Sequence, residues 1–215
     1  MSIIIQRPWT VQPQGPVRAN WGNPLTRDIQ AAWSQFDGAF LDSTGRNNGT
    51  LNSGVTRAVG ANGVVARFNG TSGKVVLPTP PAGSTLSGLS ALSIAVWLYP
   101  TSVTGLHNVF NQWPANNGPI VFCNADAMTW QVGPSSNRLL VTSVVTINTW
   151  QYFVFTASGS TLKVYKNGAL VGSSSPGITN PATVQAAEFG NNIGGTGFWV
   201  GDMGTAATWG RELAR

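Results

Sequence analysis

The chain has 215 residues, of which 26 are Gly and 13 are Pro, while charged side chains make up only 9%. Many helix-breaking residues and few charged ones argue against a coiled coil or a helical bundle. A hydrophobic share of 42% with nine Trp provides enough apolar surface for a folded core, which excludes a disordered chain.

The charge pattern excludes nucleic acid as an expected partner. The net charge is +5, but the 12 Lys and Arg residues are spread singly along the chain. Binding to nucleic acid uses cations clustered along one groove. A weakly basic surface instead favours acidic glycans or an acidic protein shell, through long-range attraction that salt screens.

Length and cysteine content suggest one domain that folds in a reducing compartment. All-β domains often reach about 200 to 250 residues as a single unit. The single Cys123 cannot form an internal disulfide, and the N-terminus has no signal-peptide pattern. No stretch supplies the roughly 20 apolar residues of a membrane helix, so we predict no membrane insertion.

Residues 1–29 are predicted to form an extended arm ahead of the domain. Four prolines interrupt this segment and favour extended backbone over helix. Its apolar side chains need a surface to cover them. Two alternatives stay open: the arm adds a strand to the chain's own sheet, or it docks on another protein. The residues proposed for docking are Ile4, Arg7, Trp9, Arg18, Trp21 and Arg27.

Residues 30–215 are predicted to form one β-sandwich domain. Short runs of β-branched and aromatic residues alternate here with Gly, Asn, Ser and Pro. Residues 92–99 alternate with a period of two, which places Leu92, Ile94, Val96 and Leu98 on one core-facing side. Residues 150–155 are apolar on both faces, as in a central strand. Asn167-Gly168 predicts a type I′ turn that joins its flanking runs as a hairpin.

Four groups of segments resemble, in the same order, the laminin-G-like and concanavalin A-like jelly-roll family. They are residues 42–51 with 66–70, 92–100, 150–168, and 193–195 with 201–213. The resemblance spans roughly residues 33–213 and implies an all-β fold, a two-sheet antiparallel jelly-roll sandwich. Some members hold a structural calcium ion, which prefers several hard oxygen ligands. Asn69 and Gly204 stand where the family usually has acidic residues, so we expect no metal site.

The arm carries a resemblance of its own. Residues 12–18 and 20–26 resemble the N-termini of laminin-G-like proteins encoded by bacteriophages and prophages. This likeness implies a non-enzymatic virion structural protein, a head decoration or appendage component, that is assembled in the host cytoplasm. The arm would anchor it to capsid or tail proteins, with the jelly roll displayed outside. Such proteins generally work as symmetric oligomers, so we expect a dimer or trimer.

The residue types disfavour catalysis. Some relatives of this fold are glycoside hydrolases, which need two carboxylates at catalytic separation. No two acidic residues here lie within four positions of each other, so a glycoside hydrolase is the least favoured alternative. His107 is the only histidine and no Gly-x-Ser-x-Gly motif is present. We expect a surface His107 and a small buried Cys123, with no catalytic residue and no cofactor.

A lectin-like module that binds host-surface glycans is the main alternative to the virion role. Exposed aromatic rings stack on sugar faces, and amide side chains bind sugar hydroxyls. The candidates for these contacts are Trp113 with Gln112, Asn116 and Asn117, then Trp130 and Trp199. The remaining strand tryptophans, expected in the core, are Trp33, Trp97, Trp150 and Trp209.

Overall fold

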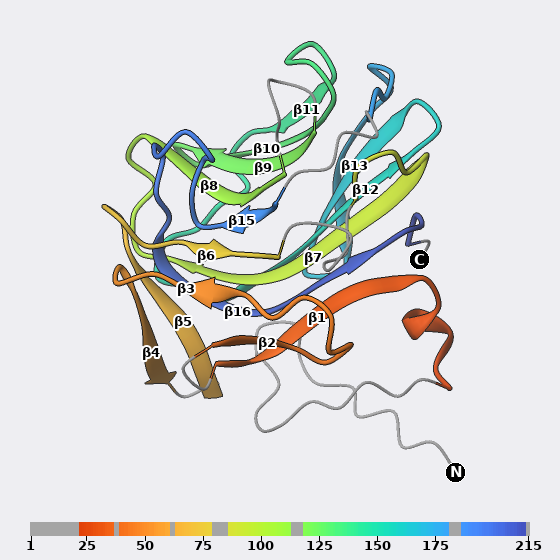
Figure 1. Ribbon diagram of the computed structural model, residues 1–215. Coiled ribbons are helices and arrows are strands. Elements are labelled where there is room, and N and C mark those ends of the chain that lie inside the picture. The colour runs from red at the N-terminus through yellow and green to blue at the C-terminus, as the bar shows by residue number, and fades with distance from the viewer. Residues whose placement is uncertain are drawn as a thin grey trace.

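The computed structural model describes residues 22–36, 39–60, 63–78, 86–112, 118–180 and 186–213. Over these residues the chain forms two antiparallel sheets packed face to face (Figure 1), and a single 3₁₀ turn, η1 (Pro24–Thr26), is the only helix. The predicted all-β, two-sheet antiparallel jelly-roll sandwich is therefore confirmed. No helix in the described part of the chain has the length and apolar character needed to cross a membrane.

The larger sheet has nine strands over the described residues. They are β1 (Ile29–Phe36), β2 (Phe40–Asp42), β4 (Val55–Gly60), β5 (Gly63–Asn69), β7 (Ala91–Pro100), β12 (Gln151–Ser158), β13 (Thr161–Lys166), β14 (Ala169–Ser174) and β16 (Val200–Trp209). The main order is β14-β13-β12-β7-β16-β1-β2, with β5 pairing β16 and β4 pairing β5. Strands distant in sequence thus lie side by side, as a jelly roll requires.

The smaller sheet has seven strands over the described residues. They are β3 (Thr50–Leu51), β6 (Val75–Val76), β8 (Leu106–Asn111), β9 (Pro119–Asn124), β10 (Ala127–Val132), β11 (Arg138–Val141) and β15 (Glu188–Phe189). Their order is β11-β10-β9-β8-β15-β6-β3. Both sheets receive strands from both halves of the chain, so neither can form without the other half.

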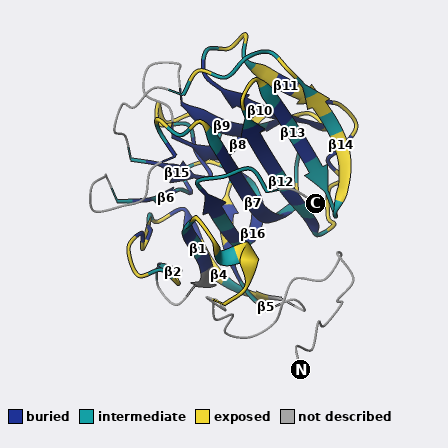
Figure 2. Ribbon diagram, turned by 90° about the vertical axis from the view of Figure 1, so that its right-hand side faces the viewer, coloured by how far each residue is buried: buried dark blue, intermediate teal, exposed yellow. Residues whose placement is uncertain are grey.

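The core lies between the sheets, and Figure 2 shows the central strands as the buried part of the sandwich. The predicted core face of β7 is confirmed, because its four aliphatic side chains are buried: Leu92, Ile94, Val96 and Leu98. The opposite face of β7 is buried as well at Ser93, Ala95 and Trp97. Alternation alone identifies one apolar face but does not show whether the other face is covered.

The predicted central strand and hairpin are both confirmed. β12 lies between β7 and β13 and pairs with both. At the β13–β14 turn, Asn167 and Gly168 have φ values of +50° and +82°, the two positive values that a type I′ turn requires. The Asn167 amide oxygen also accepts a hydrogen bond from Tyr152 N (2.9 Å), which ties the turn to β12.

Three of the four tryptophans expected in the core are buried: Trp33, Trp97 and Trp209. Trp33 packs between Phe40 and Phe189, with ring centroids 5.6 Å and 5.1 Å away. Trp150 differs, because it precedes β12 and is only half-buried, 5.4 Å from the ring of Tyr99. An end-of-strand position leaves one side of its indole outside the sheet.

Asp42 organises the turn that follows β2. Its carboxylate accepts hydrogen bonds from the main-chain N–H groups of Ala32 (2.8 Å), Thr44 (3.0 Å), Arg46 (3.2 Å) and Asn47 (3.0 Å). The Thr44 hydroxyl and the Asn47 side-chain amide donate to it as well. The segment that resembles the family's early turn is thus held by a single buried side chain.

Candidate functional site

A hollow of about 440 Å³ opens at the end of the sandwich where β7 begins and β12 ends. Three segments line it: residues 88–91, residues 158–159, and Ile178 with Asn180. Small-molecule sites in proteins commonly enclose about 300 to 1,000 Å³. The hollow therefore has the size of a site for a small ligand or for one end of a larger one.

Asn180 fastens two of these segments together. Its Nδ2 donates hydrogen bonds to the carbonyl oxygens of Leu86 and Leu89, the latter at 3.1 Å. On the third side, Gly159 has φ +58°, a conformation that glycine adopts without the strain other residues would incur. It closes the tight β12–β13 turn beside Ser158, which fixes that wall of the hollow.

The lining combines hydrogen-bonding groups with aliphatic surface, and none of the described residues in it is charged. Ser90 is exposed and Ser158 is half-buried, and each contributes a hydroxyl group. The Oδ1 atom of Asn180 is buried and has no hydrogen-bond partner among the described residues. Leu89 and Ile178 pack against the core and add apolar surface. Hydroxyl, amide and aliphatic groups together are the functional groups that contact sugars.

The first four residues predicted to bind glycan are either outside the described residues or buried. Trp113, Asn116 and Asn117 lie outside the described residues. Gln112 is described and is only 1% exposed, and its Oε1 accepts a hydrogen bond from Leu86 N at 2.9 Å. The prediction of Gln112 as a direct ligand contact is therefore wrong, because its amide is enclosed in the fold, where it holds the segment that leads to the hollow.

Trp130 and Trp199 were also predicted to stack on sugars, and both predictions are wrong. Both side chains are 0% exposed, so neither ring presents a face to a ligand. The Nε1 of Trp130, in β10, donates to the carbonyl oxygen of Thr156 in β12 (2.9 Å) and so bridges the two sheets. Trp199 lies with its ring centroid 6.5 Å from that of His107.

A pattern in the sequence could have revealed the burial of Trp130. Met128, Trp130 and Val132 alternate with polar residues along β10, and all three apolar side chains are buried. This period of two is typical of a strand with one core face. No comparable pattern surrounds Trp199, which precedes β16, so its burial could not be found this way.

Five of the six carboxylates in the described residues are held by other groups of the fold. Four form ion pairs, which are Arg27–Asp28 (3.5 Å), Arg67–Asp202 (2.8 Å), Lys74–Glu188 (2.9 Å) and Lys163–Glu212 (2.8 Å). Asp42 accepts main-chain hydrogen bonds in the turn after β2. Asp126 lies exposed in the β9–β10 turn, and Asp37 is outside the described residues. Glycoside hydrolysis needs one carboxyl group that can be protonated beside another that stays ionised. Carboxylates tied to cations are poorly suited to the first role.

Asn69, which stands where the family usually has an acidic residue, closes its own turn. Its Oδ1 accepts hydrogen bonds from the N–H groups of Thr71 (3.0 Å), Ser72 (2.9 Å) and Gly73 (3.0 Å). An oxygen facing three donors is not oriented toward a cation. Within the described ranges no group of three or more His, Cys, Asp and Glu side chains could hold a metal ion.

His107 is buried, not on the surface as expected. Its Nδ1 lies 2.7 Å from the carbonyl oxygen of Phe198, and its Nε2 lies 3.0 Å from that of Thr104. Both ring nitrogens therefore contact main-chain acceptors, which joins the β7–β8 loop to the segment before β16. A histidine engaged in this way is structural and does not serve as a base for a nucleophile.

Cys123 is a small buried residue, as predicted. It is fully buried, and burial, followed by the nearby charge of Asp126, raises the pKa of its thiol to about 12. Since the thiolate is the reactive form, Cys123 is chemically inert in the folded protein.

A thiol-labelling experiment tests this state of Cys123. At pH 8 we expect Ellman's reagent to leave the folded protein unmodified, because a pKa near 12 leaves on the order of one thiol in ten thousand ionised. The same protein in guanidinium chloride should release one equivalent of chromophore within minutes. Rapid labelling without denaturant would contradict the buried, protonated thiol.

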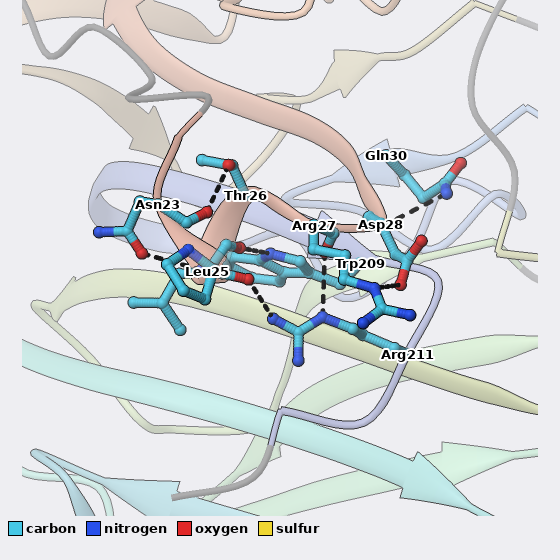
Figure 3. Close-up of polar contacts among 9 residues, drawn as sticks. Asn23, Leu25, Thr26, Arg27, Asp28, Gln30, Trp209 and Arg211 are labelled. Carbon is cyan, nitrogen blue, oxygen red and sulfur yellow. Dashed lines mark hydrogen bonds and ion pairs between the residues drawn. The ribbon is translucent and has the colours of Figure 1, made fainter.

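The last described part of the predicted arm is attached to the sandwich (Figure 3). Trp209 Nε1 donates to the carbonyl oxygen of Leu25 (2.7 Å), and Arg211 donates to those of Arg27 and Pro24 (both 3.0 Å). The side chain of Arg27 is 82% exposed and pairs with Asp28. Ile4, Arg7, Trp9, Arg18 and Trp21 lie outside the described residues. The docking role of the arm and the boundary at residue 29 therefore stay predictions.

Comparison with solved structures identifies proteins of similar fold. The binding domain of Paraclostridial Mosquitocidal Protein 1 aligns with a TM-score of 0.72 at 15% identity, over 88% of this chain and 50% of that one. Domain 4 of AbnA, a GH43 extracellular arabinanase from Geobacillus stearothermophilus, solved in complex with arabinotriose, aligns with a TM-score of 0.68 at 19% identity, over 87% and 94%. Botulinum neurotoxin type C, described as depending on two ganglioside molecules to enter cells, aligns with a TM-score of 0.62 at 11% identity, over 87% and 49%.

These identities show the fold alone, and the chain spans about half the length of the two toxin structures. No curated protein sequence matches the chain. The sequence model of a laminin G family, described as the concanavalin A-like lectin/glucanases superfamily, matches residues 69–215. That match covers more than half of the sequence and agrees with the two-sheet antiparallel sandwich, so the chain belongs to the concanavalin A-like lectin/glucanases superfamily.

Proposed function

We propose that this protein is a non-catalytic carbohydrate-binding module and that the hollow at the β7–β12 end is its sugar site. The observation that carries the proposal is the lining of the hollow, in which Ser90, Ser158 and Asn180 stand beside Leu89 and Ile178. A sugar ring presents hydroxyl groups at its rim and C–H groups on its faces. The lining offers partners for both, with no charged group to be desolvated.

Asn180 shapes the hollow in this proposal. Because its Nδ2 donates to two main-chain carbonyl groups, the orientation of its amide is set. Its Oδ1 is closed to solvent and has no hydrogen-bond partner among the described residues, which costs about 1 to 3 kcal/mol. A ligand hydroxyl recovers that free energy only where its binding opens this amide to the hollow.

Two of the structural neighbours support a saccharide as the ligand class. AbnA domain 4 was solved with arabinotriose, and this chain spans 94% of that domain. The botulinum neurotoxin type C structure is described in terms of two ganglioside molecules. These descriptions concern those proteins and do not locate a site here. They support the choice of sugars over other small polar ligands.

A non-catalytic role is supported by the chemistry of the described side chains. Four of their carboxylates are paired with cations, and Cys123 is buried with a raised pKa. These described groups assemble neither a pair of carboxylates free of cations nor an activated nucleophile. Binding is the chemistry that the remaining groups can perform.

A glycan array followed by calorimetric titration tests the proposal. We expect the protein to retain at least one saccharide with an affinity between micromolar and millimolar. Ser90→Trp should weaken that binding at least tenfold, because Ser90 is exposed at the hollow and a bulky ring there fills it. The melting temperature should not change.

The matched control is Ser53→Trp, which adds the same ring at an exposed turn position outside the lining. This variant should bind like the wild type. The proposal fails if no saccharide is retained at millimolar concentration, or if Ser90→Trp binds as tightly as Ser53→Trp.

The virion role stays a prediction. It depends on the arm, residues 1–29, of which residues 1–21 lie outside the described residues, and on a resemblance that the structural neighbours do not address. The dimer or trimer, the capsid or tail partners and the location in a virion rest on the same segment. A glycan-binding module is compatible with display on a particle, so the two roles do not exclude each other.

A further inference from the structure

The charged residues of the chain are arranged around three long segments that contain none. Residues 75–125, 139–162 and 167–187 contain no Lys, Arg, Asp or Glu. The hollow is built from these same segments, because residues 88–91 belong to the first, residues 158–159 to the second, and Ile178 and Asn180 to the third. The folded chain therefore brings its three uncharged segments together at one site.

Three stretches of these segments, residues 79–85, 113–117 and 181–185, lie outside the described residues and also contain no charged residue. His107 is the one titratable imidazole in these segments, and both of its nitrogens contact carbonyl oxygens of Thr104 and Phe198.

Four of the six charged residues that flank the three segments are engaged within the fold, and the other two, Asp126 and Arg138, are exposed. Lys74 pairs with Glu188 and Lys163 pairs with Glu212, with N–O distances of 2.9 Å and 2.8 Å. Lys166 donates through Nζ to the carbonyl oxygen of Val144 (2.6 Å). These cations are thus already bound to partners within the protein.

An acidic sugar requires a cationic partner, and none of the described residues that line the hollow is charged. Carboxylate and sulfate groups are bound by charge-assisted hydrogen bonds, above all from Arg and Lys. Removing such an anion from water without a cationic partner costs several kcal/mol. A sugar hydroxyl is uncharged, has a far smaller desolvation cost, and can pair with the hydroxyl groups of Ser90 and Ser158.

We infer that the hollow selects uncharged saccharides and excludes glycan ends that carry sialic acid, uronic acid or sulfate. This inference rests on the proposed carbohydrate-binding function and names the ligand class of the same site. It also runs against the net charge of +5, which by itself favours acidic glycans at long range. At the site, the groups in contact with the ligand determine which saccharides bind, because salt screens the long-range field.

Matched glycan pairs test the inference. Each pair shares one core and differs only in whether its end carries a sialic acid or a sulfate. We expect the uncharged member to bind the wild-type protein at least tenfold more tightly. Binding of the uncharged member should change less than twofold between 50 mM and 500 mM NaCl, because no ion pair forms on binding.

Two variants of equal net charge separate the local effect from the long-range one. Ser90→Arg places a cation at the rim of the hollow, and Ser53→Arg places one outside its lining. We expect Ser90→Arg to shift the preference at least fivefold toward the acidic member, and Ser53→Arg to leave the preference unchanged. Equal shifts in both variants would assign selection to the overall field and overturn the inference.

The outcomes distinguish this inference from the proposed function. Tighter binding of the acidic members by the wild-type protein overturns the inference while the carbohydrate-binding function stands. A complete lack of binding to either member of every pair removes the proposed function itself.

Discussion

Replacement of Asp42 by Ala is expected to lower the free energy of unfolding by about 3 to 4 kcal/mol. The buried carboxylate accepts hydrogen bonds from four main-chain N–H groups, at Ala32, Thr44, Arg46 and Asn47. Alanine leaves these donors without their acceptor, whose side chain is only 6% exposed in the folded protein. Urea denaturation at pH 7 measures the loss.

Asp126→Ala is the matched control for this substitution. Asp126 is an exposed carboxylate in a turn, so its removal should change the free energy of unfolding by less than about 0.5 kcal/mol. A similarly small effect of Asp42→Ala would show that water replaces the carboxylate in its turn, and the structural role assigned to Asp42 would be wrong.

The same carboxylate predicts how stability depends on pH. Burial by itself raises the pKa of Asp42, but the hydrogen bonds from Thr44, Ala32 and Asn47 together outweigh burial and lower the pKa below its usual value of 3.8. A lowered pKa in the folded state means that this stabilisation is fully present above about pH 4 and is lost as the pH falls through the folded-state pKa. The stability difference between the wild type and Asp42→Asn should therefore shrink from pH 5 to pH 2.

Replacement of Trp130 by Ala is expected to lower the free energy of unfolding by about 3 to 5 kcal/mol, the usual cost of removing a buried indole. The ring is fully buried and contacts Phe155, with centroids 5.9 Å apart. The Nε1 hydrogen bond to Thr156 links the two sheets. Trp130→Phe should lose less, because it keeps most of the apolar contact and removes only the hydrogen bond.

Chemical denaturation and glycan binding separate a core role of Trp130 from a stacking role. Leu140→Ala, on the neighbouring strand β11 at 54% exposure, is the control and should have little effect. At temperatures where Trp130→Phe remains folded, its affinity for saccharides should equal that of the wild type. A selective loss of binding without a loss of stability would restore Trp130 as a ligand contact.

The arrangement of the hollow explains why sequence patterns predict a residue near it, Gln112, but none of the residues that line it. Gln112 is a candidate from sequence because it adjoins Trp113. Its side chain accepts a hydrogen bond from Leu86 N, and the Leu86 carbonyl oxygen accepts one from Asn180. The groups that line the hollow carry no motif. Ser90 and Ser158 are 68 positions apart, and Ser158 and Asn180 are 22 positions apart. A single serine or asparagine is equally typical of a turn.

The burial of His107 and Trp199 illustrates a second limit. Each lies near glycines and asparagines, a setting that favours a surface loop when only the sequence is known. In the structure the segment before β16 lies against β8. The carbonyl oxygen of Phe198 lies within hydrogen-bonding distance of the His107 ring, and Trp199 packs in the core. Whether such a segment is covered depends on strands far away in the sequence.

Local patterns in the sequence are enough to predict the all-β class, the core face of β7, the central position of β12 and the Asn167-Gly168 turn. These features follow from backbone preferences and from alternation among residues close together in the chain. The identity of the buried tryptophans and of the uncharged groups that share the hollow depends instead on how the two sheets pack. Burial depends on the second sheet that covers a side chain, and the hollow exists only where three distant segments meet after the strands have paired.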